Sequence, residues 1–136
     1  MANWDLLAEL CTTPGTSGRE ERLRALVKRE FTTLVEETRV DALGNVVGRR
    51  GRSGQRLMIA AHMDEIGFLV RHINDEGYLY FAPVGGWDAE IVIGQRVFVH
   101  TATGRVEGVI GKRAIHLMDA ADRDKRSELH TLWIDI

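Results

Sequence analysis

The chain has 136 residues, 44% hydrophobic and 28% charged, with a formal net charge of -2 at pH 7. These values suit one compact domain or two small ones and argue against disorder. The nearly balanced charge, without a basic run, argues against a nucleic-acid partner, and no segment approaches the roughly 20 apolar residues of a membrane span. The single cysteine, Cys11, rules out an internal disulfide and indicates a reducing, cytoplasmic location.

The N-terminal part predicts two helices. Residues 3–12 form an amphipathic helix with Cys11 on its apolar side, which predicts a buried structural thiol. Ser17 and Glu20 have the spacing of a capping box, in which each side chain bonds the other residue's amide, at the start of a second helix. Apolar residues recur in this helix at intervals of three and four, which leaves the basic residues on a solvated face. These basic residues are Arg22, Arg24, Lys28 and Arg29.

A β-hairpin follows the helices. Residues 38–42 and 45–49 form two strand-like runs, and Gly44 between them can adopt a positive φ. Asp41 and Asn45 flank the turn. Turn chemistry accounts for both residues without a functional role.

The segment on which the rest of the chain depends is residues 57–67. Residues 57–61 form an apolar run of strand length, interpreted as a buried core strand, and His62, Asp64 and Glu65 follow directly. In α/β proteins, ligands and reacting groups collect where strands end, and imidazole and carboxylate groups bind divalent metals. The spacing fits either a metal site or the solvated end of a core strand.

The C-terminal half changes to short strands separated by glycine turns. Five or six such strands predict a small antiparallel barrel. Residues 119–126 predict a short helix or an exposed loop, and the apolar final strand, residues 129–136, leads us to expect that the chain is an excerpt of a longer protein. The other expected strands are residues 68–73, 78–82, 92–101 and 105–110.

Hydrolysis at a pair of metal ions needs about five protein ligands and a separate general base. A carboxylate two residues from a ligating histidine can orient its imidazole, and His62 with Asp64 fits that arrangement. No paired glutamates follow His62 to supply a base, and no serine-elbow, Walker or dinucleotide-binding motif is present. His72 and His100, in alternating strands, are more simply structural. His116 lies near Lys112 and Arg113, which is a poor place for a second cation, and His130 lies beside the end of the given sequence.

Three motifs occur in the order seen in one enzyme family: TPGTSGRE at residues 13–20, DALGN at 41–45 and AAHMDEIG at 60–67. They resemble the tetrahedral aminopeptidases, also called glutamyl or deblocking aminopeptidases, whose members have often been named endoglucanases or cellulases. Residues 104–111 and 132–136 are similar to the domain inserted in that family.

This resemblance implies an α/β fold class: a partial catalytic domain at residues 1–67, then a small antiparallel β-barrel insert at residues 68–136 that takes part in homo-oligomer assembly. The complete site would hold two divalent ions, zinc or cobalt. His62 matches the first metal ligand and Asp64 the catalytic acidic residue behind it. The bridging aspartate, catalytic glutamate and later ligands lie beyond the insert in the family, so only a partial site is expected. Asp135 matches the closing strand of the insert and is not assigned as a ligand.

The sequence therefore predicts the N-terminal part of a metal-dependent aminopeptidase that removes N-terminal residues from peptides and is inactive as this chain alone. The main alternative is a non-catalytic, truncated paralogue that acts in self-association or partner binding. A glycan hydrolase is a third hypothesis, because such enzymes use two carboxylates that flank the scissile bond.

Overall fold

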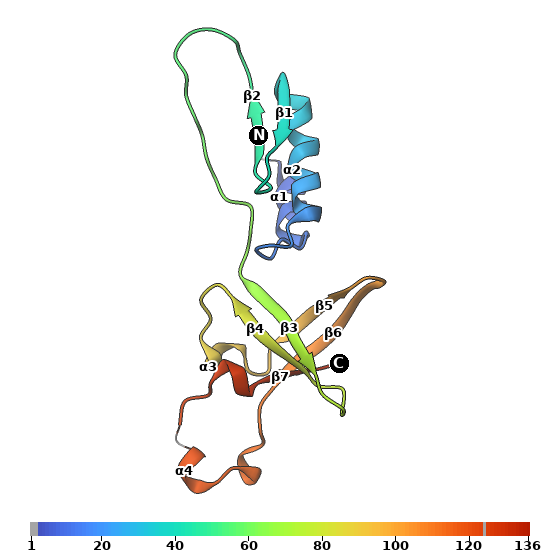
Figure 1. The fold of residues 1–136 in the computed structure, drawn as a ribbon, viewed down its shortest axis with the longest axis vertical. Helices are drawn as coiled ribbons and strands as arrows, with labels where there is room; N and C mark the ends of the chain where they lie inside the picture. The colour runs from blue at the N-terminus through green and yellow to red at the C-terminus, as the bar shows by residue number, and fades with distance from the viewer. Residues whose placement is uncertain (1–2, 124) are drawn as a thin grey trace. The chain divides into compact units, whose positions relative to one another are not determined.

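The computed structural model describes residues 3–123 and 125–136, which form two compact units divided between Glu65 and Ile66 (Figure 1). The assignment of these units to a catalytic domain and an assembly insert remains a prediction. The first unit contains α1 (Trp4–Thr12), α2 (Glu21–Leu34), β1 (Glu37–Val40) and β2 (Val46–Arg49).

The hairpin packs on α2. β1 and β2 pair antiparallel, which confirms the expected hairpin. A Cβ on Gly48 of β2 would lie 2.8 Å from a ring carbon of Phe31, so the strand approaches the helix closely. Leu23 and Leu26 of α2 are buried, whereas Leu34 is exposed.

Helix α1 buries none of its residues. Its N-terminus is capped by Asn3, whose side chain accepts a hydrogen bond from the amide of Leu6 at 3.1 Å. Cys11 is exposed, so the expectation of a buried thiol is wrong. The apolar side of an amphipathic helix is buried only when another layer covers it, and the described residues supply no such layer here.

Two arginines of α2 make contacts that the prediction of a solvated face missed. The Nε of Arg24 donates to the carbonyl of Gly44 at 3.0 Å, which ties the hairpin turn to the helix. Arg29 forms a two-pronged ion pair with Glu9, at 2.9 and 2.7 Å, which joins α2 to α1. The helical spacing could not reveal these contacts, because their partners lie 20 residues away in sequence.

The hairpin turn is built by local polar contacts. Asp41 Oδ1 accepts hydrogen bonds from the amides of Leu43 and Asn45, and Oδ2 accepts one from the Asn45 side chain. These bonds, those from Asn45 first among them, hold the pKa of Asp41 below its usual value. The interpretation of both residues as turn-forming is confirmed.

The predicted core strand at residues 57–61 is not a strand in the structure. Figure 1 shows the segment between β2 and β3 without an arrow, and Leu57, Met58 and Ile59 are 87%, 87% and 89% exposed. A run that is apolar on both faces forms a strand only between neighbouring strands and covering layers. Within the described part of the chain, nothing provides them.

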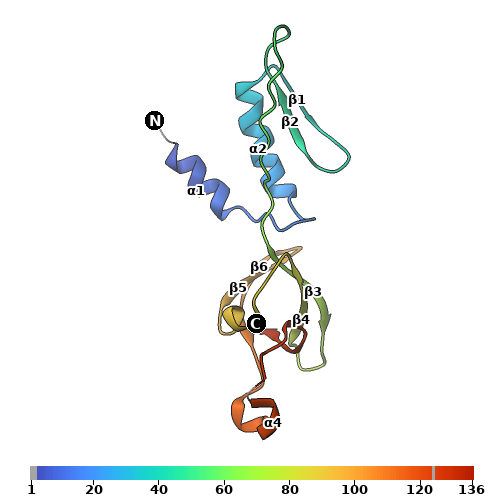
Figure 2. The same ribbon diagram turned by 90° about the vertical axis from the view of Figure 1, so that its left-hand side faces the viewer.

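The second unit is a five-stranded antiparallel sheet in the order β3-β4-β7-β6-β5. Figure 2 labels four of these strands, β3, β4, β5 and β6. The two hairpins, β3 with β4 and β5 with β6, confirm the strand pairs expected from the glycine turns. The last strand along the chain, β7, lies in the middle of the sheet between them. The strands are β3 (Gly67–Ile73), β4 (Leu79–Val84), β5 (Arg96–Thr101), β6 (Gly104–Gly111) and β7 (Trp133–Asp135).

The core of this unit forms where β7 joins the two hairpins. Leu132, at 0% exposure, packs with Ile110 and Ile134, and the rest of the cluster is Leu79, Phe81 and Val92. A Cβ on Gly108 of β6 would lie 2.9 Å from the carbonyl oxygen of Asp135, so the two strands approach closely there. The final segment therefore completes this core.

The expected barrel is only partly realised. β3 and β5 are the two ends of the sheet, and no pairing closes it among the residues that the structure describes. An antiparallel sheet with a single buried face is stable without closure, which is the arrangement here. Short helical segments connect the strands: α3 (Ala89–Val92), η1 (Ile115–Leu117), α4 (Ala120–Arg123) and η2 (Leu129–Thr131).

The short helix α4 falls within residues 119–126, where a helix or loop was expected, although Asp124 lies outside the described residues. None of the helices described is both long and apolar enough to cross a membrane.

Candidate functional site

The segment that carries His62 is held by the loop that precedes α2. Thr16 and Glu65 form an isolated parallel bridge. The Glu65 amide donates to the carbonyl of Gly15 at 2.8 Å, and the Ser17 amide donates to the carbonyl of Glu65 at 3.2 Å. The Gly15 amide also donates to the Glu65 side chain at 3.3 Å. We refer to residues 13–18 as the clamp loop.

Gly15 lets the clamp loop approach both the helix and the His62 segment. The glycine is buried, and a Cβ on it would lie 2.6 Å from Cδ2 of Leu23 and 3.5 Å from the carbonyl oxygen of Met63. Leu23 is a buried residue of α2. The position of the His62 segment therefore depends on the packing of α2 through the clamp loop.

Three polar side chains meet at this point. Asp64 Oδ2 accepts a hydrogen bond from the Ser17 hydroxyl at 2.5 Å. Asp64 Oδ1 lies 3.1 Å from Nδ1 of His62. The hydrogen bond from Ser17 is the largest influence on the pKa of Asp64 and lowers it, and the bond with His62 lowers it further.

The contacts of His62 define which of its ring nitrogens carries a proton. Nδ1 lies 3.0 Å from the carbonyl oxygen of Asp64 as well as 3.1 Å from its carboxylate. A carbonyl and a carboxylate oxygen can only accept hydrogen bonds, so Nδ1 must be the donor. In the neutral ring this leaves the lone pair on Nε2, and the His62 side chain is 86% exposed. Such a nitrogen can ligate a metal ion.

The structure brings His62 and Asp64 together as their spacing suggested, but it corrects the predicted capping box. Helix α2 begins after Glu20 and has no side-chain cap at its N-terminus. The Ser17 hydroxyl bonds Asp64 instead, and Glu20 accepts from the amide of Gly18 and pairs with Arg24. Sequence reasoning missed Ser17 as a site residue because its local spacing had a simpler explanation. Its partner lies 47 positions away.

Among the described residues, no group of three or more His, Cys, Asp or Glu side chains is arranged to hold a metal ion. The other histidines have local neighbours: His72 lies beside Tyr80, with ring centroids 6.2 Å apart, and His130 lies 3.2 Å from Glu128. The described part of the chain therefore offers one well-oriented imidazole, that of His62, without a cluster of further metal-binding side chains around it.

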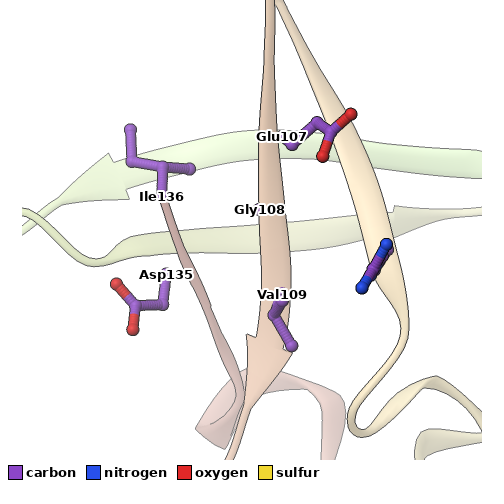
Figure 3. A pocket seen from close by; sticks show the side chains of 6 residues that line it. Glu107, Gly108, Val109, Asp135 and Ile136 are labelled. Atoms are coloured by element: carbon purple, nitrogen blue, oxygen red, sulfur yellow. The ribbon is translucent and has the colours of Figure 1, made fainter.

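A separate open pocket lies on the sheet of the second unit, lined by β5, β6 and the end of the chain. In Figure 3, the carboxylates of Glu107 and Asp135 point away from each other, so they do not form a paired acidic site. This arrangement gives no reason to assign Asp135 as a metal ligand. The complete lining is Arg96, Glu107, Gly108, Val109, Asp135 and Ile136.

The second unit and the His62 segment are similar in sequence to a known class of peptidases. Residues 44–136 match the M42 glutamyl aminopeptidase family. The chain is a member of this family, as the three sequence motifs suggested.

Known proteins match nearly all of the chain but extend well beyond it. The lysyl aminopeptidase of Pyrococcus furiosus is 35% identical and covers 100% of this chain, which spans 40% of that relative. The crystal structure of a TET aminopeptidase from a marine sediment archaeon, Thaumarchaeota archaeon SCGC AB-539-E09, has a TM-score of 0.92 at 36% identity, covering 98% of this chain and 38% of that one. The Pyrococcus horikoshii TET1 peptidase, which can assemble into a tetrahedron or a large octahedral shell, has a TM-score of 0.84 at 39% identity, covering 99% and 40% of the two chains.

Proposed function

We propose that this chain is the N-terminal portion of a metal-dependent aminopeptidase, in which His62 supplies one metal ligand and Asp64 orients it. The observation that carries the proposal is the pair of acceptors at His62 Nδ1, which leaves Nε2 available to a metal. Family membership supports the reaction class, and the similarity to a lysyl aminopeptidase supports a peptide substrate. The single cysteine is compatible with a cytoplasmic location.

His62 and Asp64 fit one part of a divalent metal site, namely one ligand and the carboxylate that orients it. His62 would hold the ion through Nε2, and zinc or cobalt accepts imidazole ligands. In the complete site two such ions would lower the pKa of a bound water and so supply the nucleophile. Asp64 would keep the imidazole in the tautomer that can bind and would raise its basicity. The remaining ligands and the general base would come from residues other than those that the structure describes.

The exposed run at residues 57–61 supports the same proposal. Leu57, Met58 and Ile59 are apolar on both sides of an extended segment, as in a strand at the centre of a covered sheet. We infer that the remainder of the catalytic domain packs on this segment. His62 would then stand at the end of a central strand, where α/β enzymes place reacting groups.

A titration with Co²⁺ tests the proposal on the whole chain. We expect Co²⁺ to shift or broaden the backbone amide NMR signals of residues 60–67, and this effect to vanish in His62→Ala. His72→Ala is the matched control, because it removes a histidine on β3 without touching the site. Identical responses of the wild type and His62→Ala would overturn the assignment of His62.

An activity assay tests the second part of the proposal. We expect no release of N-terminal residues from short peptides by this chain alone, because one histidine cannot hold two ions. Measurable peptidase activity that His62→Ala abolishes would contradict the partial-site interpretation.

A second candidate function, self-association through the second unit, is favoured by a specific observation. Strand β3 lies at one end of the sheet and exposes Leu69, Val70 and Ile73. Unpaired edge strands with apolar side chains associate readily. Under the non-catalytic alternative, the chain forms oligomers that a chelator does not dissociate, and His62→Ala leaves them unchanged.

Native mass spectrometry tests the second candidate. Val70→Lys places a charge on the edge strand and is expected to convert oligomers to monomers. A wild-type chain that is monomeric at all concentrations tested would remove the support for the assembly function.

A further inference from the structure

The hydroxyl of Ser17 begins a line of three side chains, Ser17, Asp64 and His62, that are joined by two contacts. It bonds Asp64 Oδ2 at 2.5 Å, and Asp64 Oδ1 in turn faces His62 Nδ1 at 3.1 Å. A carboxylate has no hydrogen to give, so the serine is the donor in the first contact. The two oxygens of Asp64 are therefore used by two different partners, one from the clamp loop and one from the site.

The position of Ser17 is fixed by contacts that do not involve Asp64. Its amide bonds the carbonyl of Glu65, and the Arg19 amide closes a turn on the carbonyl of Thr16 at 2.7 Å. The clamp loop is also held against α2, where Gly15 meets Leu23. The serine hydroxyl therefore lies at a point set by the packing of the first unit.

Asp64 needs such an external anchor. The residues before it, 57–61, are exposed and outside any strand, and the Asp64 side chain is itself 41% exposed. An exposed carboxylate is free to rotate among several rotamers, of which only some place Oδ1 beside His62. The bond from Ser17 selects one of them.

We propose that Ser17 is a positioning residue for the histidine ligand. Its hydroxyl holds Asp64 in the rotamer that accepts Nδ1–H of His62, and this keeps the lone pair on Nε2. The expected effect of Ser17 on metal binding rests on the proposed function, in which His62 binds a metal ion through Nε2. The effect on the imidazole tautomer is independent of any metal.

The tautomer of His62 is the first readout, measured on the full chain without metal by long-range ¹⁵N–¹H NMR at about pH 8, above the ordinary pKa of histidine. We expect Nδ1–H to predominate in the wild type. In Ser17→Ala, the ratio of Nδ1–H to Nε2–H is expected to fall by about two- to tenfold, as for the loss of one hydrogen bond. Thr33→Ala is the matched control, because it removes a hydroxyl that bonds only the carbonyl of Glu30 in α2.

Two Ser17 variants with side chains of equal shape separate the effect of the hydroxyl from the effect of side-chain packing. Ser17→Thr keeps the donor, whereas Ser17→Val replaces it with a methyl group. We expect threonine to retain the wild-type tautomer and valine to behave like alanine. An unchanged tautomer in both Ser17→Ala and Ser17→Val would overturn the proposal, as would the same shift in threonine and valine.

Binding of Co²⁺ is the second readout. Loss of a residue that orients a metal-bound histidine lowers affinity by roughly 10–100-fold. Ser17 acts one step further away, so we expect Ser17→Val to weaken Co²⁺ binding at His62 by up to about tenfold relative to Ser17→Thr. If wild-type His62 binds no Co²⁺ but the tautomer still depends on the Ser17 hydroxyl, the proposed function fails and the positioning role stands. If Co²⁺ binds equally well to all variants and the tautomer is unchanged, the positioning role fails and the proposed function stands.

Discussion

The two units of this chain bury their apolar residues to very different extents. The second unit has a continuous core of six buried residues around β7, whereas the first buries Leu23 and Leu26 and leaves Leu57, Met58 and Ile59 almost fully exposed. A folded unit must offset its lost conformational entropy by burying apolar surface. The second unit therefore has the features of a self-contained fold, whereas the first leaves a large apolar segment uncovered.

The candidate site lies in the first unit. His62 and Asp64 follow the exposed run, and polar contacts with the clamp loop hold them in place. Local hydrogen bonds can hold two side chains in an ordered arrangement even where little apolar surface is buried around them. The clamp loop supplies these bonds here.

The largest expected effect comes from the core of the second unit. Leu132→Ala removes a fully buried side chain and is expected to lower the free energy of unfolding by about 2–5 kcal/mol. Leu57→Ala, at an exposed site, is expected to change it by less than about 0.5 kcal/mol. Urea denaturation followed by tryptophan fluorescence measures both. Similar effects of the two substitutions would erase the contrast between the units.

A smaller effect is expected where β6 approaches β7. A Cβ on Gly108 would meet Cγ2 of Ile134 at 2.5 Å and the carbonyl oxygen of Asp135 at 2.9 Å. Gly108→Ala is therefore expected to destabilise the sheet by about 1–3 kcal/mol. Gly86→Ala is the control, because nothing lies within 4 Å of a Cβ there. Equal urea midpoints for the two variants would show that β7 is not tightly packed on β6.

The smallest effect concerns the hairpin turn of the first unit. Bonds from Asn45 and Leu43 lower the pKa of Asp41 in the folded chain. The ionised carboxylate therefore adds stability that is present above its unfolded pKa, about 3.9, and is lost as the pH falls through the lower folded value. Asn45→Ala is expected to raise the pKa of Asp41 toward the ordinary value in a ¹³C carboxyl titration. The control Asn74→Ala alters the equivalent turn of the second unit and should leave Asp41 unchanged. An unaltered Asp41 titration in Asn45→Ala would contradict the turn geometry.

The sequence predicted the features that depend on local spacing. The hairpins follow from alternating residues and glycine turns, and the roles of Asp41 and Asn45 follow from bonds within five residues. The proximity of His62 and Asp64 follows from their separation by one residue. Contacts of this kind can be predicted because both partners lie close together in the sequence.

Features that depend on distant partners were missed or misread. The Ser17 hydroxyl was expected to cap helix α2 but instead bonds the carboxylate of Asp64, 47 positions away in sequence. Arg29 was expected to face solvent but forms an ion pair with Glu9. Residues 57–61 have the composition of a core strand, but composition cannot supply neighbouring strands. The placement of β7 in the centre of its sheet depends on the pairing of β4 and β6 with it, which no local pattern reveals.

Hydrogen–deuterium exchange of the full chain tests the contrast between the units most directly. We expect amides of β6 and β7 to exchange slowly, because they pair across a buried core, and amides of residues 57–61 to exchange at nearly the rate of an unstructured peptide. Fast exchange in β7, or protection of residues 57–61 equal to that of β6, would contradict the difference in burial between the two units.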